Sequence, residues 1–89
     1  MTRLPVICGD HDRPVDLGES WTLAVVDGDR RMEREQVSGN AVVETKRGVR
    51  WTCPKCRRQL SLPWRAWRGI VAEHRTNDGA PIDIAKYKP

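Results

Sequence analysis

Apolar and polar positions divide the chain into short segments separated by turn residues. The first segment, Leu4–Cys8, is an apolar run that predicts a strand leading into a turn at 9–12. Residues 21–26 form the next predicted strand, and Asp27-Gly28 after it favours a tight hairpin. Its partner, residues 30–37, is dense in charge, so this segment is consistent with a strand, with a helical turn or with an exposed edge.

A second hairpin is predicted in the middle of the chain. Ser38-Gly39-Asn40 breaks the pattern, and the segments 41–46 and 49–52 on either side of Arg47-Gly48 are typical of two short strands. The second of these strands ends immediately before Cys53. The sequence therefore places a cysteine at the end of a strand, as it does with the first cysteine of the chain.

One helix is predicted beyond Cys56, where the apolar spacing changes from a period of two to a helical period. Ser61 is placed to cap this helix, and Pro63 suits its first turn. Turn residues at 77–81 end the helix, and the segment 82–84 alternates apolar and polar residues as a short final strand. Strands followed by one helix in the C-terminal half predict an α+β fold.

At 100° per residue the predicted helix has two distinct faces. One face gathers apolar residues and a histidine: Trp67, Ile70, Val71 and His74. The other is a basic stripe of Arg65, Arg68 and Arg75, with Trp64 at its edge. Together with Arg57 and Arg58, which precede the helix, this stripe favours contacts with phosphates, and Trp64 is placed to stack on a base.

The same basic residues fit two other interpretations. A charged helix face is satisfied by solvent alone, with Arg68 lying over Trp64 as a local cation–π pair. Arg and Trp are also favoured in protein interfaces, so a protein partner explains these residues equally well. Because Trp21, Trp51 and Trp67 lie in apolar runs, we expect them in the core and Trp64 as the exposed anchor.

Composition limits the kind of protein that this chain forms. Of its 89 residues, 38% are hydrophobic and 31% are charged, which predicts one folded domain over residues 1–89. Charged residues interrupt every segment before it reaches the roughly 18 apolar residues of a membrane span, and the N-terminus lacks an apolar signal core. We therefore expect a soluble, cytoplasmic protein. A core this small often needs a staple such as a metal ion.

Three cysteines and one histidine form two closely spaced pairs, Cys8-Gly9-Asp10-His11 and Cys53-Pro54-Lys55-Cys56. This spacing lets one tight turn direct both of its ligands at one ion, and two such turns complete the tetrahedron that a structural zinc prefers. The predicted site is therefore a zinc ion bound by Cys8, His11, Cys53 and Cys56. The long segment between the two pairs is tolerable, because loop-closure entropy rises only logarithmically with length.

Each predicted ligand has an alternative role. Cys53 and Cys56 have the spacing of a dithiol redox pair, although the residues after them do not indicate an immediate long helix that would lower the pKa of Cys53. Cys8 is alternatively a buried structural thiol, and His11 a surface residue of the turn. His74 is the substitute for the fourth ligand, unless it packs on the helix face.

The paired turns resemble those of zinc-ribbon proteins, whose two metal-bearing turns lie at the ends of β-hairpins. The resemblance rests on the ligands Cys8, His11, Cys53 and Cys56 and on the Cys-Pro-Lys-Cys turn, and it covers less than half of the chain. The histidine in the first turn, the long insert and the helix after the second turn depart from the usual pattern. The resemblance implies a small zinc-ribbon-like antiparallel β domain that binds nucleic acid, docks on proteins or acts as a structural staple.

No catalytic centre is predicted from the sequence. Four protein ligands close a zinc site, no spare histidine remains for general-base chemistry, and no glycine-rich phosphate loop occurs. The formal net charge of +4 favours an anionic partner. We expect a zinc-stabilised binding module that binds nucleic acid, or alternatively a protein-docking adaptor or inhibitor, without a membrane or a small-molecule substrate.

Overall fold

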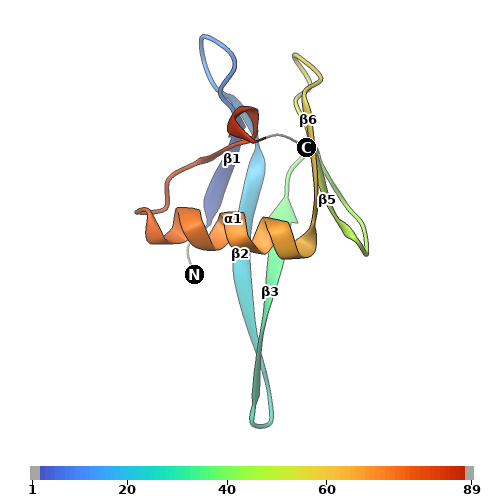
Figure 1. Ribbon diagram of the computed structural model, residues 1–89, viewed down its shortest axis with the longest axis vertical. Helices are drawn as coiled ribbons and strands as arrows, with labels where there is room; N and C mark the ends of the chain where they lie inside the picture. Colours follow the sequence, from blue (N-terminus) through green and yellow to red (C-terminus); the bar gives the residue numbers. More distant parts are fainter. Residues whose placement is uncertain (1–2, 88–89) are drawn as a thin grey trace.

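The computed structural model describes residues 3–87, which form seven strands, one α-helix and one short 3₁₀ helix. The strands are β1 (Leu4–Cys8), β2 (Val15–Asp27), β3 (Arg30–Ser38), β4 (Val42–Glu44), β5 (Gly48–Thr52), β6 (Gln59–Pro63) and β7 (Ile82–Asp83). The helices are α1 (Trp64–Thr76) and the 3₁₀ helix η1 (Ile84–Lys86). Strands with a single α-helix in the C-terminal half confirm the predicted α+β class (Figure 1).

The strands form two sheets, and α1 lies across both of them (Figure 1). One sheet has the order β3-β2-β1-β7, in which β1 and β7 are parallel and the other neighbours are antiparallel. The second sheet is antiparallel with the order β4-β5-β6. Because α1 contacts strands of both sheets, its apolar face closes the core between them.

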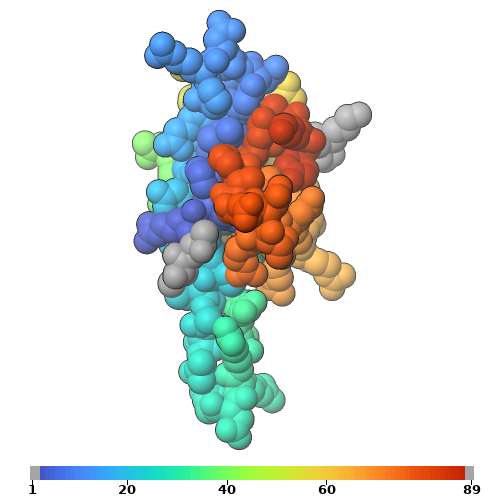
Figure 2. Space-filling view, turned by 90° about the vertical axis from the view of Figure 1, so that its left-hand side faces the viewer, coloured from blue at the N-terminus to red at the C-terminus, as the bar shows by residue number. Residues whose placement is uncertain are grey.

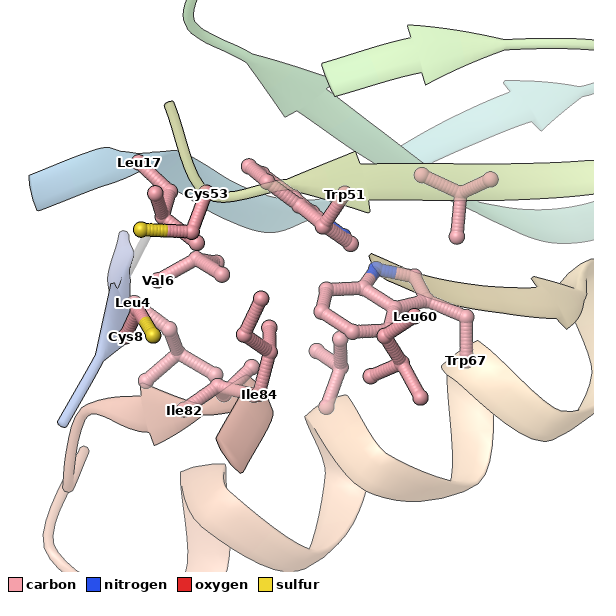
Figure 3. Packing of buried hydrophobic residues seen from close by; sticks show 12 residues of the cluster. Leu4, Val6, Cys8, Leu17, Trp51, Cys53, Leu60, Trp67, Ile82 and Ile84 are labelled. Atoms are coloured by element: carbon pink, nitrogen blue, oxygen red, sulfur yellow. The ribbon is translucent and has the colours of Figure 1, made fainter. Parts of the chain in front are cut away.

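The core contains two of the three tryptophans that the sequence analysis placed there, Trp51 and Trp67 (Figure 3). Both are fully buried, and their ring centroids lie 5.5 Å apart. The indole N–H of Trp67 donates a 3.0 Å hydrogen bond to the hydroxyl oxygen of Ser20, which is also buried. The aliphatic part of the core is Leu4, Val6, Leu17, Val49, Leu60, Val71, Ile82 and Ile84.

The placement of Trp21 in the core was wrong. Its side chain is only half-buried, and the guanidinium of Arg3 lies 4.5 Å from the centroid of its ring. The reason is that β1 pairs with β2 only as far as Ser20, so the residues beyond Ser20 have no third strand beside them.

Strands β2 and β3 form a long hairpin, and their outer part, residues 21–36, is called the hairpin arm below (Figure 2). The tight turn after Asp27 is confirmed, and Gly28 there has a φ of 62°, a conformation that glycine adopts without steric cost. The charge-dense segment after the turn is a strand, not a helical turn. Strand β2 begins at Val15 and not at residue 21, because β1 pairs with its first part.

The boundaries of the predicted helix were wrong at the N-terminal end. Ser61 does not cap the helix, because it lies in β6 and accepts a 3.2 Å hydrogen bond from Nε of Arg50. Pro63 is the residue before the helix, with a ψ of 154°, and α1 begins at Trp64. Pairing with β5 holds this segment extended. The local sequence pattern does not predict this conformation, because it depends on another strand.

The predicted final strand is shorter than expected. It ends at Asp83, and Ile84 opens η1 instead, because the side chain of Asp83 accepts a hydrogen bond from the backbone N–H of Ala85. The second hairpin is confirmed, although its first strand covers only Val42–Glu44.

Candidate metal centre

The four predicted metal ligands lie together at one end of the long axis of the molecule, where the turns after β1 and β5 meet (Figure 1). One donor atom from each of Cys8, His11, Cys53 and Cys56 lies within 4.8 Å of all the others. The sulfur atoms of Cys8 and Cys56 are 3.8 Å apart, and the sulfur of Cys53 is 3.4 Å from Nε2 of His11. This group can hold one metal ion.

The second turn is shaped by its own backbone. The N–H of Arg57 donates to the carbonyl oxygen of Cys53 at 2.8 Å, and the N–H of Cys53 donates to the carbonyl oxygen of Arg58 at 2.9 Å. Arg57 has a φ of 60°, a left-handed conformation that reverses the chain after Cys56. The turn therefore directs Cys53 inward, where it is fully buried, and leaves Cys56 at the surface.

The first turn is held by the C-terminal segment. The N–H of Gly9 donates a 2.8 Å hydrogen bond to Oδ1 of Asp83, the same atom that accepts from Ala85. A side chain at position 9 would collide with this carboxylate, so the close contact requires glycine. Arg58 then joins the two turns, because its guanidinium donates to Oδ2 of Asp10 at 2.9 Å.

The two buried thiols differ in their acidity. Burial raises the pKa of Cys53, but backbone N–H groups of Cys56 and Lys55 and the ring of His11 outweigh burial and lower this pKa to about 6. Burial raises the pKa of Cys8 to about 11, although the backbone N–H of Asp10 opposes this effect. Because the thiolate is the form that binds metal, Cys53 is better prepared than Cys8 to act as a ligand.

His74, the alternative fourth ligand, is engaged elsewhere. Its Nδ1 lies 3.1 Å from the carbonyl oxygen of Ala80, and its Nε2 lies 2.7 Å from the hydroxyl of Tyr87. With Nδ1 protonated, His74 donates to Ala80 and accepts from Tyr87, so both ring nitrogens have partners. The residue is half-buried on the helix and links Tyr87 to α1.

The predicted partner-binding arginines fall into two separate groups. Arg57 and Arg58 lie in the turn at the metal end, whereas the basic stripe of Arg65, Arg68 and Arg75 is exposed on α1. The turn and the helix lie at opposite ends of β6 (Figure 1). Of the five arginines, only Arg68 lines the cavity beside Trp64.

A cavity of ≈ 660 Å³ lies between the hairpin arm, the β4–β5 turn and the start of α1, and we call it the Trp64 groove. It is lined by Arg34, Glu35, Gln36, Glu44, Thr45, Lys46, Trp64 and Arg68. The sequence analysis singled out Trp64 and Arg68 but missed the rest. No periodicity along residues 30–37 or 44–46 indicates that these residues line a groove.

Glu35 is the most deeply buried charged side chain in the groove, with 9% of its surface exposed. Its Oε2 accepts a 2.9 Å hydrogen bond from the hydroxyl of Thr22 on the neighbouring strand. Burial raises the pKa of Glu35, although the hydroxyl of Thr22 and the charges of Arg75 and Arg68 oppose this effect. No ion pair to Glu35 occurs within residues 3–87.

Comparison of the chain with protein-family models, with curated proteins and with solved structures gives no match. Within the described part of the chain, no helix has the combination of length and apolar character needed to cross a membrane.

Proposed function

We propose that the four-ligand group is a structural zinc site. Three sulfurs and one imidazole are a donor set that zinc accepts in tetrahedral geometry, with Zn–S bonds of about 2.3 Å and Zn–N bonds of about 2.0 Å. Such a tetrahedron has S···S edges of about 3.8 Å and S···N edges of about 3.6 Å. The sulfurs of Cys8 and Cys56 are separated by 3.8 Å, and Cys53 and His11 by 3.4 Å, so the donor spacing fits this ion.

We propose that the zinc is structural and that the protein is not an enzyme. Four protein ligands leave no open coordination position for water or a substrate, which a catalytic zinc requires. A resemblance to zinc ribbons remains part of the proposal, and it rests on the two turns alone. Thiolate ligands are retained in a reducing compartment, which favours the cytoplasm.

We further propose that the protein binds single-stranded nucleic acid in the Trp64 groove. The observation that carries this proposal is the grouping of one partly exposed indole with three cationic side chains, Arg34, Lys46 and Arg68, in one cavity. An indole stacks on any base, and the cations neutralise phosphates. Arg65 and Arg75 extend the positive surface along α1.

A second candidate function, docking on a protein, is favoured by the hairpin arm. Four of its apolar side chains are exposed, namely Leu23, Val25, Val26 and Met32, with Val26 at 72% exposure. Leu23, Val25 and Met32 share one face of the arm, because Val25 pairs with Met32 and side chains alternate along a strand. Exposed apolar side chains grouped in this way are typical of protein-binding surfaces. The two functions are separable, because the apolar side chains of the arm do not line the Trp64 groove.

The proposed nucleic-acid binding is tested by its dependence on salt. Neutralisation of phosphates by three cations gives a slope of about −2 in a plot of log affinity against log salt for a single strand. Arg68→Ala is expected to reduce the magnitude of this slope by roughly 0.7. Arg13→Ala removes the same charge from the turn after β1, outside the groove, and is expected to leave the slope nearly unchanged. Micromolar wild-type protein without salt-sensitive binding would refute the proposal.

A further inference from the structure

We infer that the Trp64 groove takes a guanine base and that Glu35, the most buried charged side chain of its lining, is the residue that selects this base. The inference rests on the proposed function, since it names the base that the same groove accepts from a single strand. It is carried by the position and the unused hydrogen-bonding capacity of one carboxylate.

The burial of Glu35 is unusual for its chemistry. The side chain is 9% exposed, lines the groove and receives one hydrogen bond, from Thr22 to Oε2. Its other oxygen, Oε1, accepts no hydrogen bond from the residues that the structure describes, and it is not fully buried, so it remains accessible from the solvent. A ligand that brings hydrogen-bond donors into the groove can therefore pair with this oxygen.

The carboxylate restricts which base fits. An ionised carboxylate only accepts hydrogen bonds, and its two oxygens offer about four acceptor positions, of which Thr22 occupies one. Guanine presents two adjacent donors, N1–H and the N2 amino group, on its Watson–Crick edge. Adenine, cytosine and thymine each place an acceptor beside their donor, so one of their polar atoms would face a carboxylate oxygen. Glu35 therefore favours guanine by attraction and disfavours the other bases by repulsion.

The remaining walls of the groove suit a nucleotide. The indole N–H of Trp64 donates a 2.8 Å hydrogen bond to the carbonyl oxygen of Thr45, which fixes the plane on which a base stacks. Arg34, Lys46 and Arg68 supply three positive charges for the flanking phosphates. These three cations outnumber the two carboxylates of the groove, Glu35 and Glu44, and so disfavour a basic peptide as the occupant.

The test uses the zinc-loaded full chain and eight-nucleotide thymidine strands that carry guanine, hypoxanthine, adenine or cytosine at one central position. Fluorescence anisotropy at constant salt measures each affinity. We expect the guanine strand to bind at least about fivefold more tightly than the adenine strand. The hypoxanthine strand should lie between them, because hypoxanthine keeps N1–H but lacks the N2 amino group.

Two variants assign the preference to the carboxylate. Glu35→Gln keeps the size of the side chain but places an amide N–H₂ group among the donors of guanine, so the preference for guanine should disappear. Thr22→Val keeps the carboxylate but removes the hydroxyl that positions Oε2, so the preference should weaken. Glu33→Gln is the matched control, because Glu33 lies on the same strand, is exposed and does not line the groove. This control should retain the full preference.

The outcomes separate the inference from the proposed function. Salt-sensitive binding of all four strands with equal affinity overturns the selection of guanine and leaves nucleic-acid binding intact. A guanine preference that survives in Glu35→Gln overturns the role of Glu35. If Glu35→Gln does not fold, the ratio of affinities in Thr22→Val decides instead. A wild-type chain without salt-sensitive binding overturns both the inference and the proposed function.

Discussion

The two ends of the molecule are held by different interactions, although strands run into both of them (Figures 1 and 2). At the metal end, four side chains from distant segments converge within 4.8 Å beside the core. At the opposite end, the hairpin arm extends past the core and is held by backbone pairing between β2 and β3. The arm carries four of the exposed large apolar side chains, whereas Cys8 and Cys53 at the metal end are fully buried.

This difference predicts that the metal end stabilises the fold and that the arm contacts a partner. An isolated two-stranded hairpin is at best marginally stable in water, so the arm depends on the body of the protein to which it is attached. The body has a small core and depends in turn on the two turns that the proposed zinc would link. Substitutions at the metal end should therefore affect the whole fold, whereas substitutions of the exposed side chains in residues 23–32 of the arm should affect only contacts with a partner.

Removal of the metal is expected to have the largest effect. The binding free energy of a structural zinc becomes folding free energy when the unfolded chain has no site for it. Treatment with a strong chelator, or Cys53→Ala, should therefore abolish the cooperative thermal transition measured by circular dichroism. Elemental analysis before and after treatment should show the loss of one zinc ion per chain. A chain without metal that still unfolds cooperatively at the same temperature would contradict this prediction.

The next largest effect is expected from Trp67, which links α1 to the core. Replacement of Trp67 by alanine leaves a cavity next to Trp51 and should lower the free energy of unfolding by about 3 to 5 kcal/mol. Trp67→Phe keeps an aromatic ring but leaves Ser20 without its donor, and should cost less than the alanine variant. Urea denaturation of the zinc-loaded proteins measures both values. Equal losses in the two variants would show that the hydrogen bond, and not ring volume, dominates.

The sequence predicted those parts of the fold that local patterns determine. The first strand, the turn after Asp27, the second hairpin and the single helix all follow from residues that are neighbours along the chain. Strand β6 and the parallel pairing of β1 with β7 were not predicted, because they depend on partners that are distant in sequence. Trp21 was misplaced for the same reason, since its burial depends on where β1 ends.

The candidate sites divide in the same way. The spacing of the cysteines and of His11 was enough to predict four metal ligands that the structure brings together. The Trp64 groove was predicted only in part, through Trp64 and Arg68 on the helix. Glu35 comes from β3 and Lys46 from the β4–β5 turn, and only the packing of these segments against α1 places them in one cavity. No periodicity within one segment indicates such a meeting.

A smaller effect, of opposite sign, is expected from Arg57 in the second metal turn. Its φ of 60° costs a residue with a side chain roughly 1 to 2 kcal/mol, and glycine avoids most of this cost. Arg57→Gly should therefore raise the free energy of unfolding by about 1 kcal/mol. Arg57→Ala is the control, because it removes the same charge but keeps the Cβ atom. An equal gain in both variants would assign the effect to charge and contradict the role of the backbone.

The buried carboxylate of Glu35, which we propose selects the base, should lower the stability of the folded protein at neutral pH. Burial raises its pKa in the folded protein, so its contribution to stability is fully present below the pKa of the unfolded chain and is lost as the pH rises through the folded pKa. Glu35→Gln avoids this loss. The variant should be more stable than the wild type at pH 7.5, and the difference should shrink as the pH falls toward the ordinary pKa of a glutamate, about 4.3. Urea denaturation across this range measures the difference, with Asp29→Asn at the exposed turn of the arm as the control.

The smallest effect on stability is expected in the hairpin arm. Val25 is 41% exposed and its cross-strand neighbour Met32 is 48% exposed, so their replacement by threonine removes little buried surface. The double variant should change the free energy of unfolding by less than about 0.5 kcal/mol. Hydrogen exchange should be faster in residues 24–33 than in β1 in both proteins, since strand pairing alone protects the arm.

The same double variant distinguishes the two candidate partners. Its side chains lie outside the Trp64 groove, so binding of single strands and its salt dependence should be unchanged. A protein that docks on the arm should lose affinity, because the variant removes apolar surface that only a partner covers. A loss of stability comparable to that of the Trp67 variants would instead mean that the arm contributes to the core of the fold, and the separation between a stabilising end and a binding end would fail.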